Sequence, residues 1–334
     1  MGKKLNVGVI GLGRLGRAYA QYFAYHIPDA RLVAVADADP AALKSASEEL
    51  GIDKSFQDYH DLLGVREVDA VAILTPTKLH RDVVIAAAQA GKTIFCEKPL
   101  SISLKESVEM MEVIEKTKVF FHMGFMRRYD PGYAAAKTKI DAGEIGTPVV
   151  IKCSSRDPFR PSLEYANPIN SGGLLIDMGI HDFDLVRWFM GEVKSVYSVG
   201  GTLAYPEMKP IGDIDNAIVN MYFADGKLGV VDLSRNGVYG YDIRTEILGT
   251  NGTIQIGYLR ETPILVMKKE GILHDTVPYF FERFEKAYVA QLKAFVRTYL
   301  DGKPPSITCA DGVAALKVSL AATQSFAERR PVEL

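Results

Sequence analysis

The sequence is poor in cysteine, and the cysteines it has form no recognisable framework. Only three of its 334 residues are cysteines, at Cys96, Cys153 and Cys309, and no two of them make a C-x-x-C pair. An odd number of widely spaced cysteines argues against a disulfide scaffold or a zinc site and favours a reducing compartment. We therefore expect a cytoplasmic protein whose cysteines are buried as small apolar side chains.

Long apolar stretches and charge of one sign are also missing. No run approaches the roughly 20 apolar residues that are needed to cross a bilayer. The net charge is −2 and there is no long basic run, so nothing attracts a nucleic acid. The N-terminal apolar run is interrupted by Gly8, Gly11 and Gly13, which predicts a strand and not a signal peptide. We expect neither a nucleic acid nor a membrane as a partner.

Composition and length together predict two globular domains. Hydrophobic residues make up 48% of the chain and charged residues 24%, which is typical of a globular protein. A chain of 334 residues is long for one hydrophobic core. We predict one domain over residues 1–125 and another over residues 126–334, whose last helix could pack back on the first domain.

Short apolar runs alternate with helical patterns in the first domain. The predicted strands are 5–10, 32–36, 70–74, 93–96 and 119–123. The predicted helices are 13–24, 40–50, 59–63, 80–90 and 104–116. Such alternation indicates an α/β fold with a doubly wound parallel sheet, the Rossmann arrangement.

The pattern changes after about residue 125. A helix over 133–142 and a strand over 148–155 lead to a predicted loop over 156–171 and a helix over 174–189. Strand-like runs follow at 193–200, 217–223, 228–233, 241–248, 252–256 and 264–268, and helices at 281–300 and 310–327. Successive strands joined by tight turns predict an α+β domain with an open, mainly antiparallel sheet. A ligand is expected in the crevice at the carboxyl ends of the parallel strands.

A glycine-rich turn follows the first predicted strand and opens the first helix. It reads Gly11-Leu12-Gly13-Arg14-Leu15-Gly16 and matches G-x-G-x-x-G. Gly11 permits the tight turn, Gly13 lets the backbone approach a pyrophosphate, and Gly16 allows close packing of helix on strand. The free N–H groups of the helix start bind phosphate. The motif in this context predicts a dinucleotide-binding domain.

Asp37 indicates which dinucleotide binds. It lies twenty-one residues past Gly16, where an acidic side chain meets the adenosine ribose and repels a 2′-phosphate. Neither Ala38 nor Asp39 offers a cation to that phosphate, so NAD is favoured over NADP, although Arg14 could reach the phosphate region. The alternative is that Asp37 caps the helix that begins at Pro40.

Lys98 is a candidate for contact with a substrate. The segment Phe95-Cys96-Glu97-Lys98-Pro99 ends an apolar strand of the nucleotide-binding domain, at the edge where ligands bind. Pro99 restricts the backbone of Lys98 and so limits its direction. The alternative is a solvated lysine in a turn.

A second group of candidates lies in the predicted helix over 174–189. Asp177, His181 and Asp184 are spaced i, i+4 and i+7 and would share one helix face. A histidine flanked by carboxylates suits proton transfer, because an aspartate orients the imidazole and stabilises its charged form. A divalent metal site is the alternative, but no further ligands stand at suitable spacing, so we expect no metal.

Three other runs contain further candidates for contact with the cofactor or the substrate. Thr75-Pro76-Thr77-Lys78-Leu79-His80 follows a strand at the edge that faces the cofactor, and Phe125 to Tyr129 marks the domain junction, where Arg127 could orient a hydroxylated substrate. Tyr239 and Tyr241 would lie on the same face if their segment is extended. Packing within the sheet is the ordinary alternative for that pair.

These motifs together resemble the glucose–fructose oxidoreductase and inositol dehydrogenase family over essentially the whole chain. The matching runs are G-L-G-R-L-G, T-P-x-x-x-H, C-E-K-P-L, G-F-M-R-R-Y-D and G-G-x-x-x-D-x-x-x-H-D-x-D. Within the family, R-N-x-x-Y-G-Y-D-I-R and E-I-L-G-T-N-G are most similar to the NAD-dependent myo-inositol 2-dehydrogenases.

The resemblance assigns roles to residues and implies a cis peptide bond between Lys98 and Pro99. The implied catalytic residues are Lys98, Asp177 and His181. The implied cofactor contacts are Gly11, Leu12, Gly13, Arg14, Leu15, Gly16, Asp37, Thr75, Pro76, His80, Glu97, Lys98 and Arg127. The implied substrate contacts are Lys98, Arg127, Asp177, His181, Asp184, Tyr239 and Tyr241.

The implied activity is NAD-dependent oxidation of a secondary alcohol of a cyclic polyol, first of all myo-inositol to 2-keto-myo-inositol. A dehydrogenase of scyllo-inositol, an aldose or a sugar acid is the alternative within the family. A non-catalytic NAD-binding sensor is the alternative outside it. Because an open sheet needs a cover on its outer face, we also expect a homo-oligomer, and the family suggests a tetramer.

Overall fold

The computed structural model describes residues 4–257, 260–262 and 264–334. These residues divide into two compact units. The first unit contains the described residues of 1–125 and 288–314, and the second contains those of 126–287 and 315–334. The prediction treated residues 126–334 as one continuous domain, whereas residues 288–314 cluster with the first unit.

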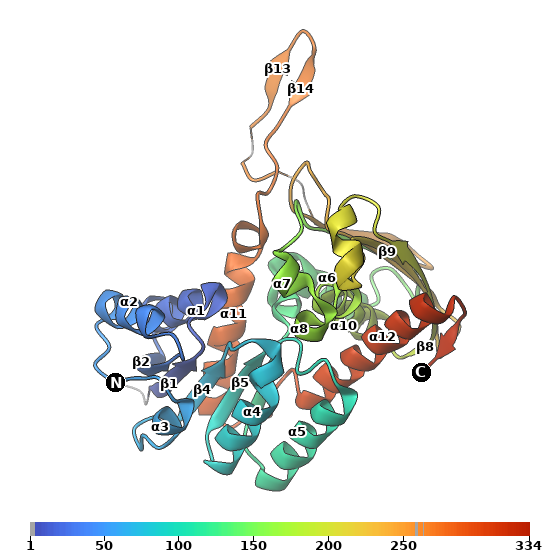
Figure 1. Cartoon of the computed structure of the whole chain (residues 1–334). Coiled ribbons are helices and arrows are strands. Elements are labelled where there is room, and N and C mark those ends of the chain that lie inside the picture. Colours follow the sequence, from blue (N-terminus) through green and yellow to red (C-terminus); the bar gives the residue numbers. More distant parts are fainter. Residues whose placement is uncertain (1–3, 258–259, 263) are drawn as a thin grey trace. The chain divides into compact units, whose positions relative to one another are not determined.

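The first unit is built on a six-stranded parallel sheet (Figure 1). Its strands are β1 Leu5–Ile10, β2 Ala30–Ala36, β3 Ser55–Phe56, β4 Ala70–Ile73, β5 Thr93–Glu97 and β6 Phe121–Gly124, in the order β3-β2-β1-β4-β5-β6. The central strands β4 and β5 are buried along their whole length, as a parallel sheet with both faces covered requires. The predicted doubly wound fold is confirmed.

Helices cover both faces of this sheet. They are α1 Arg14–Tyr25, α2 Pro40–Leu50, α3 Tyr59–Leu63, α4 His80–Gln89 and α5 Leu104–Thr117, with a single 3-10 turn η1 Thr77–Leu79. Tyr19 of α1 packs on Phe95 of β5, with ring centroids 5.8 Å apart. On the other face, a Cβ atom at Gly8 of β1 would lie 2.8 Å from Leu62 of α3.

Residues 288–314 belong to the first unit because aromatic side chains pack them there. Helix α11 Phe280–Leu300 contributes Tyr288, whose ring lies 5.8 Å from that of Tyr19, and Phe295, 5.6 Å from Phe95. Farther along, the Met123 N–H donates to the Ile307 carbonyl at 3.1 Å. No sequence period reveals such contacts, which join residues more than one hundred and eighty positions apart.

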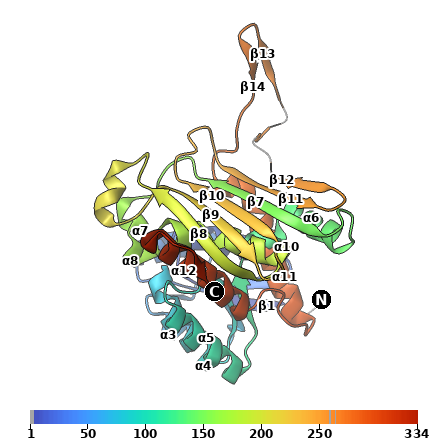
Figure 2. The same cartoon turned by 90° about the vertical axis from the view of Figure 1, so that its right-hand side faces the viewer.

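The second unit is built on a seven-stranded sheet (Figure 2). Its strands are β7 Pro148–Arg156, β8 Val193–Gly201, β9 Asn216–Phe223, β10 Leu228–Ser234, β11 Asp242–Gly249, β12 Thr253–Ile256 and β15 Val332–Glu333, in the order β12-β11-β7-β10-β9-β8-β15. All neighbouring strands pair antiparallel except β7 and β10. Strand β9 alternates buried and exposed residues, which confirms a sheet with one open face.

Short helices replace much of the predicted loop over 156–171. The described helices of this unit are η2 Met126–Tyr129, α6 Pro131–Asp141, α7 Leu163–Ala166, α8 Pro168–Ser171, α9 Leu174–Asp177, α10 Ile180–Met190 and η3 Pro206–Ile211, with the first part of α11 and the later part of α12 Cys309–Glu328. Ser162 and Asn167 cap α7 and α8 through side-chain oxygens. Capping residues in a proline-bearing stretch resemble a loop in sequence because they also favour turns.

The predicted single helix over 174–189 is wrong, because Met178 and Gly179 separate α9 from α10. The Gly179 N–H donates to Leu174 O, five residues back, at 3.1 Å. A Cβ at Gly179 would lie 2.6 Å from Leu175 O, so the tight passage needs glycine. Because α9 ends at Asp177 and α10 begins at Ile180, the three residues do not lie on one continuous helix. The i, i+4, i+7 argument for Asp177, His181 and Asp184 therefore does not hold.

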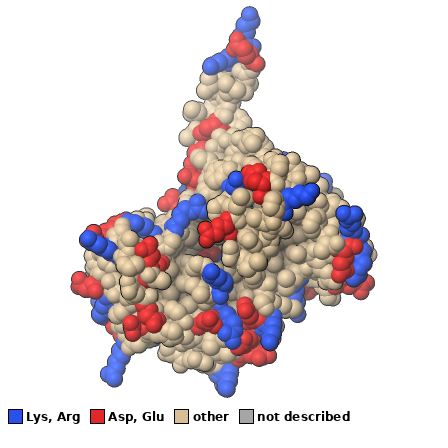
Figure 3. All heavy atoms as spheres, viewed as in Figure 1, with Lys and Arg blue, Asp and Glu red and all other residues tan. Residues whose placement is uncertain are grey.

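A two-stranded hairpin, β13 Val266–Lys268 and β14 Gly271–Leu273, projects from the rest of the second unit (Figures 1 and 2). Exposed apolar side chains run along it: Ile264, Leu265, Val266, Met267, Ile272 and Leu273. Its turn is charged, as the blue and red tip in Figure 3 shows. Within the described ranges, no helix is both long and apolar enough to span a membrane.

Candidate functional site

Two glycines let the loop between β1 and α1 pass close to neighbouring backbone. Gly11 has φ of +94°, and a Cβ there would lie 2.7 Å from the backbone of Leu74 and Thr75. A Cβ at Gly16 would lie 1.9 Å from Gly11 O. Both positions therefore exclude any other residue, as the sequence motif predicts.

Gly13 differs from these two glycines because a Cβ there would meet nothing within 4 Å. It stands at the N-cap of α1, where no described side chain caps the helix. The first N–H groups of an α-helix have no partner within the helix, and the helix dipole favours an anion there. The loop fits the pyrophosphate of a dinucleotide.

Asp37 follows β2 and binds the glycine-rich loop. Its Oδ2 accepts the Leu12 N–H at 2.5 Å, and its Oδ1 accepts the Asp39 N–H at 2.8 Å. The capping role considered for Asp37 belongs to Asp39, whose Oδ1 accepts the Ala41 N–H at the start of α2. Asp37 is half-buried at the carboxyl end of β2, and Arg14 is exposed on α1.

His80 joins the turns that follow β4 and β5. Its Nε2 lies 2.9 Å from Thr75 O and its Nδ1 lies 2.8 Å from Pro99 O. Burial lowers the pKa of His80, while its bonds to backbone carbonyls oppose that shift. The peptide bond between Lys98 and Pro99 is cis, as the family resemblance implies.

Glu97 and Lys98 stand at the end of β5 in unlike surroundings. The Glu97 carboxyl is buried, accepts the Tyr19 hydroxyl through Oε1, and accepts the Lys98 N–H through Oε2 at 3.1 Å. Burial raises the pKa of Glu97, against the opposing effects of the Tyr19 hydrogen bond and the Lys98 charge. The Lys98 side chain is only half-buried.

In the second unit, the Asp177 carboxylate is held from two sides. Its Oδ1 accepts the Tyr165 hydroxyl at 2.9 Å, and its Oδ2 lies 3.4 Å from Nη2 of Arg235. The nearby negative charge of Asp177 and burial raise the pKa of Tyr165, so the phenol remains a proton donor. The Asp177 and His181 side chains both keep some exposure.

Arg235 also approaches a second acid, Asp213, at 3.8 Å. The Asp213 Oδ1 accepts the Leu174 N–H at 2.9 Å and so holds the start of α9, the helix that ends in Asp177. Burial raises the pKa of Asp213, and the Arg235 charge opposes this. The sequence interpretation missed Tyr165, Arg235 and Asp213. Arg235 stood in a run chosen for its tyrosines, and no local pattern signalled the others.

Arg127 and Asp184 are both buried in ion pairs. Nη1 of Arg127 donates to Asp182 Oδ1 at 2.9 Å and to Ser155 Oγ at 3.1 Å. Asp184 accepts two hydrogen bonds from Arg128, at 2.9 and 2.5 Å. Each of these two predicted substrate contacts therefore has a structural partner within the second unit.

Tyr239 and Tyr241 do not share a face, because their segment is not extended. Tyr239 is in a turn, is exposed, and donates to Asp242 Oδ2 at 2.7 Å. Gly240 has φ of +139°, and Tyr241 is buried against Tyr279. The condition for a common face, an extended backbone, is not met.

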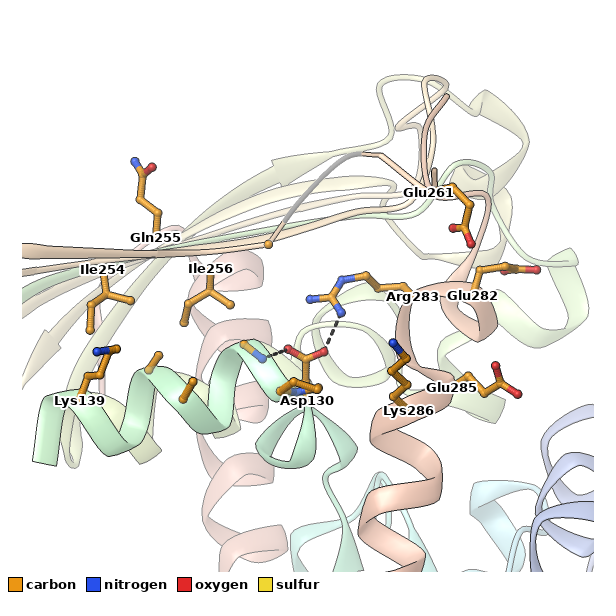
Figure 4. Close-up of a pocket in the computed structure, with 15 residues that line it drawn as sticks. Asp130, Lys139, Ile254, Gln255, Ile256, Glu261, Glu282, Arg283, Glu285 and Lys286 are labelled. Carbon is orange, nitrogen blue, oxygen red and sulfur yellow. Dashed lines mark hydrogen bonds and ion pairs between the residues drawn. The ribbon is translucent and has the colours of Figure 1, made fainter. Parts of the chain in front are cut away.

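A pocket of about 630 Å³ in the second unit lies between α6, β12 and the start of α11 (Figure 4). Arg283 points toward Asp130 there and donates to its Oδ2 at 2.7 Å. None of the sequence-predicted site residues lines it. Across the described part of the chain, no three histidine, cysteine or acidic side chains gather as a metal site would require.

The parallel sheet and the glycine-rich loop define a dinucleotide-binding protein of the Rossmann class. Residues 5–125 match the oxidoreductase family model for the NAD-binding Rossmann fold, and residues 137–334 match that for the C-terminal alpha/beta domain. The chain belongs to this family, the GFO/IDH/MocA oxidoreductases. It is an NAD-dependent oxidoreductase, so the predictions of family and cofactor are confirmed.

Its relatives include inositol dehydrogenases of full length. The chain is 42% identical to scyllo-inositol 2-dehydrogenase (NAD(+)) of Bacillus subtilis, covering 100% of this chain and 97% of the relative. It is 40% identical to myo-inositol 2-dehydrogenase of Thermotoga maritima, covering 99% and 98%. The crystal structure of scyllo-inositol dehydrogenase from Lactobacillus casei with bound NAD(H) and scyllo-inositol matches with a TM-score of 0.94 at 35% identity, covering 99% of each chain.

Gly13→Ala and Gly16→Ala should separate ligand binding from folding. Gly13→Ala adds a methyl group in open space, so we expect normal stability and NAD binding weakened ~10-fold or more by the blocked pyrophosphate. Gly16→Ala forces backbone apart and should destabilise the protein by about 2–4 kcal/mol. Calorimetric NAD titration and thermal unfolding measure the two effects. Unchanged NAD affinity in Gly13→Ala would contradict the pyrophosphate assignment.

Arg127→Met should be a stability variant. It leaves the Asp182 carboxyl buried without its cation, so we expect unfolding at lower denaturant concentration, by about 3–5 kcal/mol. The double variant Arg127→Met with Asp182→Leu removes both charges and should recover most of this loss. Wild-type stability in the single variant, with weaker ligand binding, would instead support the ligand contact implied by the resemblance.

Proposed function

We propose that this protein oxidises one ring alcohol of an inositol to a ketone with NAD, with myo-inositol as the first candidate substrate and scyllo-inositol as the second. The printed functions of the full-length relatives support this substrate class. The observation that carries the proposal is the contrast within one acidic segment. Asp182 and Asp184 are completely buried in ion pairs, whereas Asp177 and His181 remain partly exposed.

In the proposed mechanism, His181 is the general base and takes the proton of the reacting hydroxyl. The family resemblance assigns Asp177 the task of offsetting the positive charge that develops on the imidazole, and Arg235 and Tyr165 hold its carboxylate in place. Lys98 donates a hydrogen bond to the reacting oxygen, which gains negative charge as its proton leaves. NAD supplies the hydride acceptor. The carbon loses a hydride and the oxygen a proton, which leaves the ketone.

Myo-inositol and scyllo-inositol differ only in one hydroxyl, which is axial at C2 of the first and equatorial in the second. Oxidation at that carbon removes the difference, so both give 2-keto-myo-inositol. The two candidates therefore need the same catalytic groups and differ in the ring face from which hydride leaves. Discrimination rests on how the remaining hydroxyls are held, since a site built to bind a hydroxyl rejects an analogue that misplaces it.

The test is a panel of initial rates of NAD reduction with myo-inositol, scyllo-inositol, glucose, xylose and gluconate, each repeated with NADP. We expect an inositol with NAD to give the highest kcat/KM. Reduction of 2-keto-myo-inositol with NADH then reports the ring face, because the product is myo- or scyllo-inositol. Highest activity on an aldose or sugar acid would show that the protein is an aldose or sugar-acid dehydrogenase of the same family, not an inositol dehydrogenase. No turnover with tight NAD binding would favour a sensor.

His181→Ala should remove the general base and lower kcat ~10²–10⁴-fold. NAD lies on the nucleotide-binding unit in this proposal, so its dissociation constant should stay within about twofold of the wild type. His60→Ala, at an exposed histidine in α3, is the matched control and should leave both values unchanged. Stopped-flow turnover measures kcat, and calorimetry measures the dissociation constant of NAD. Loss of both in His181→Ala would indicate structural damage.

We also propose that the protein works as a homo-oligomer, with a tetramer as the assembly that the family suggests. Exposed apolar side chains on β8, β9 and β10 support this, among them Tyr197, Val199, Ile218, Tyr222 and Leu228. The residues of the hairpin strands β13 and β14 are all exposed in the described part of the second unit, and an isolated two-stranded hairpin is marginally stable in water.

The three cysteines are buried and free, as in a reducing compartment such as the cytoplasm.

A further inference from the structure

The Glu97 carboxyl lies in the core of the first unit, although it ends a strand next to the proposed catalytic lysine. Every residue of β5 is buried, and Glu97 itself is 6% exposed. A buried carboxyl is costly unless hydrogen bonds satisfy it. Its neighbours in sequence provide one such bond, from the Lys98 N–H at 3.1 Å.

The other hydrogen bonds come from distant segments of the chain. The Tyr19 hydroxyl on α1 donates to Glu97 Oε1, and Nε2 of Gln291 on α11 donates to the Tyr19 oxygen at 2.5 Å. Tyr19 and Gln291 are both completely buried. Three segments thus meet at one carboxyl: α1, the end of β5 and α11.

Packing leaves this network little freedom to rearrange. The Tyr19 ring meets Phe95 and Tyr288 edge to face, each at 5.8 Å between centroids. Gly124 of β6 pairs with Glu97, and a Cβ there would lie 2.9 Å from Oε1. The space for the carboxyl therefore exists only because residue 124 is glycine.

The electrostatics keep Tyr19 as the donor. Burial and the Glu97 charge raise the pKa of Tyr19 well above its usual value. Tyr19, Lys98 and Gln291 each oppose the rise in the pKa of Glu97 that burial causes. The other titratable neighbours are Cys96, which precedes Glu97, Tyr288 on α11, and Tyr22 on α1, whose ring lies 6.2 Å from that of Tyr19.

We propose that Tyr19 and Gln291 are positioning residues for Glu97 and Lys98. They hold the Glu97 carboxyl against the Lys98 N–H and so fix the backbone from which the Lys98 side chain projects. Because Tyr19 lies on the helix that begins at the glycine-rich loop, the same network ties Lys98 to the proposed pyrophosphate site. The inference rests on the proposed role of Lys98 in catalysis.

The variant that tests this is Tyr19→Phe, which keeps the ring and removes the hydroxyl. We expect kcat with the preferred inositol to fall ~10-fold, because Lys98 loses its alignment with the reacting oxygen. NAD affinity should stay within about twofold. Losing the Tyr19 donor raises the pKa of Glu97 further, so the acid-side fall of kcat/KM should begin at higher pH. Tyr25→Phe, on the same helix but exposed and bonded to the Glu49 carbonyl, is the control and should change none of these.

A double-mutant cycle tests whether Tyr19 acts through Glu97. In a Glu97→Gln background, Tyr19→Phe should cause little further loss of kcat, whereas independent effects would multiply. Gln291→Met should weaken the same step and shift the pH profile in the same direction. A lower melting temperature with unchanged kcat and pH profile would show a merely structural role and overturn the proposal.

One measurement does not depend on turnover. In protein labelled with ¹³C at glutamate carboxyls, the Glu97 resonance is identified by its loss in Glu97→Gln, and its titration is compared between wild type and Tyr19→Phe. A higher titration midpoint in the variant supports the network even if no inositol is oxidised, in which case the proposed function alone fails. An unchanged midpoint overturns the positioning role.

Discussion

Arginine side chains with little exposed surface meet aspartates at four places in the second unit: Arg127 with Asp182, Arg128 with Asp184, Arg283 with Asp130, and Arg235 with Asp177 and Asp213. Breaking such a pair leaves a buried charge and costs several kcal/mol, so the pairs constrain how η2, α9 and α10 pack. Asp177 differs from the other partners because its carboxylate keeps 14% exposure. The pairing that stabilises this unit therefore leaves Asp177, the acid of the proposed mechanism, as the most exposed of these carboxylates.

In the first unit the corresponding constraint is the close approach of backbone to backbone. Gly11 and Gly16 remove side chains where the loop, β4 and α1 converge, and Gly124 leaves room for the Glu97 carboxyl. Gly13 removes a side chain where no protein atom lies nearby. Among these four glycines, Gly11, Gly16 and Gly124 permit close packing, whereas Gly13 leaves open space at the start of α1, where the dinucleotide is expected.

The sequence predicted most of the secondary structure because local periodicity encodes it. The bounds of β1, α2 and α3 agree with the structure residue for residue, and the NAD-binding fold was correctly expected from the glycine spacing. The strands β3, β14 and β15 were missed, since two or three residues cannot show an alternation. The break between α9 and α10 was missed because glycine inside a helical pattern is often tolerated.

The sequence alone determined the fold class, the family and the dinucleotide, because each depends on residues close together in the chain. It also singled out Lys98, Asp177 and His181 as candidates. Only the tertiary structure decided what surrounds them: Arg235 reaches Asp177 across 58 positions and Gln291 reaches Tyr19 across 272. Hydrogen bonds and ion pairs over such separations follow from how helices and strands pack, and no local pattern of residue types specifies them.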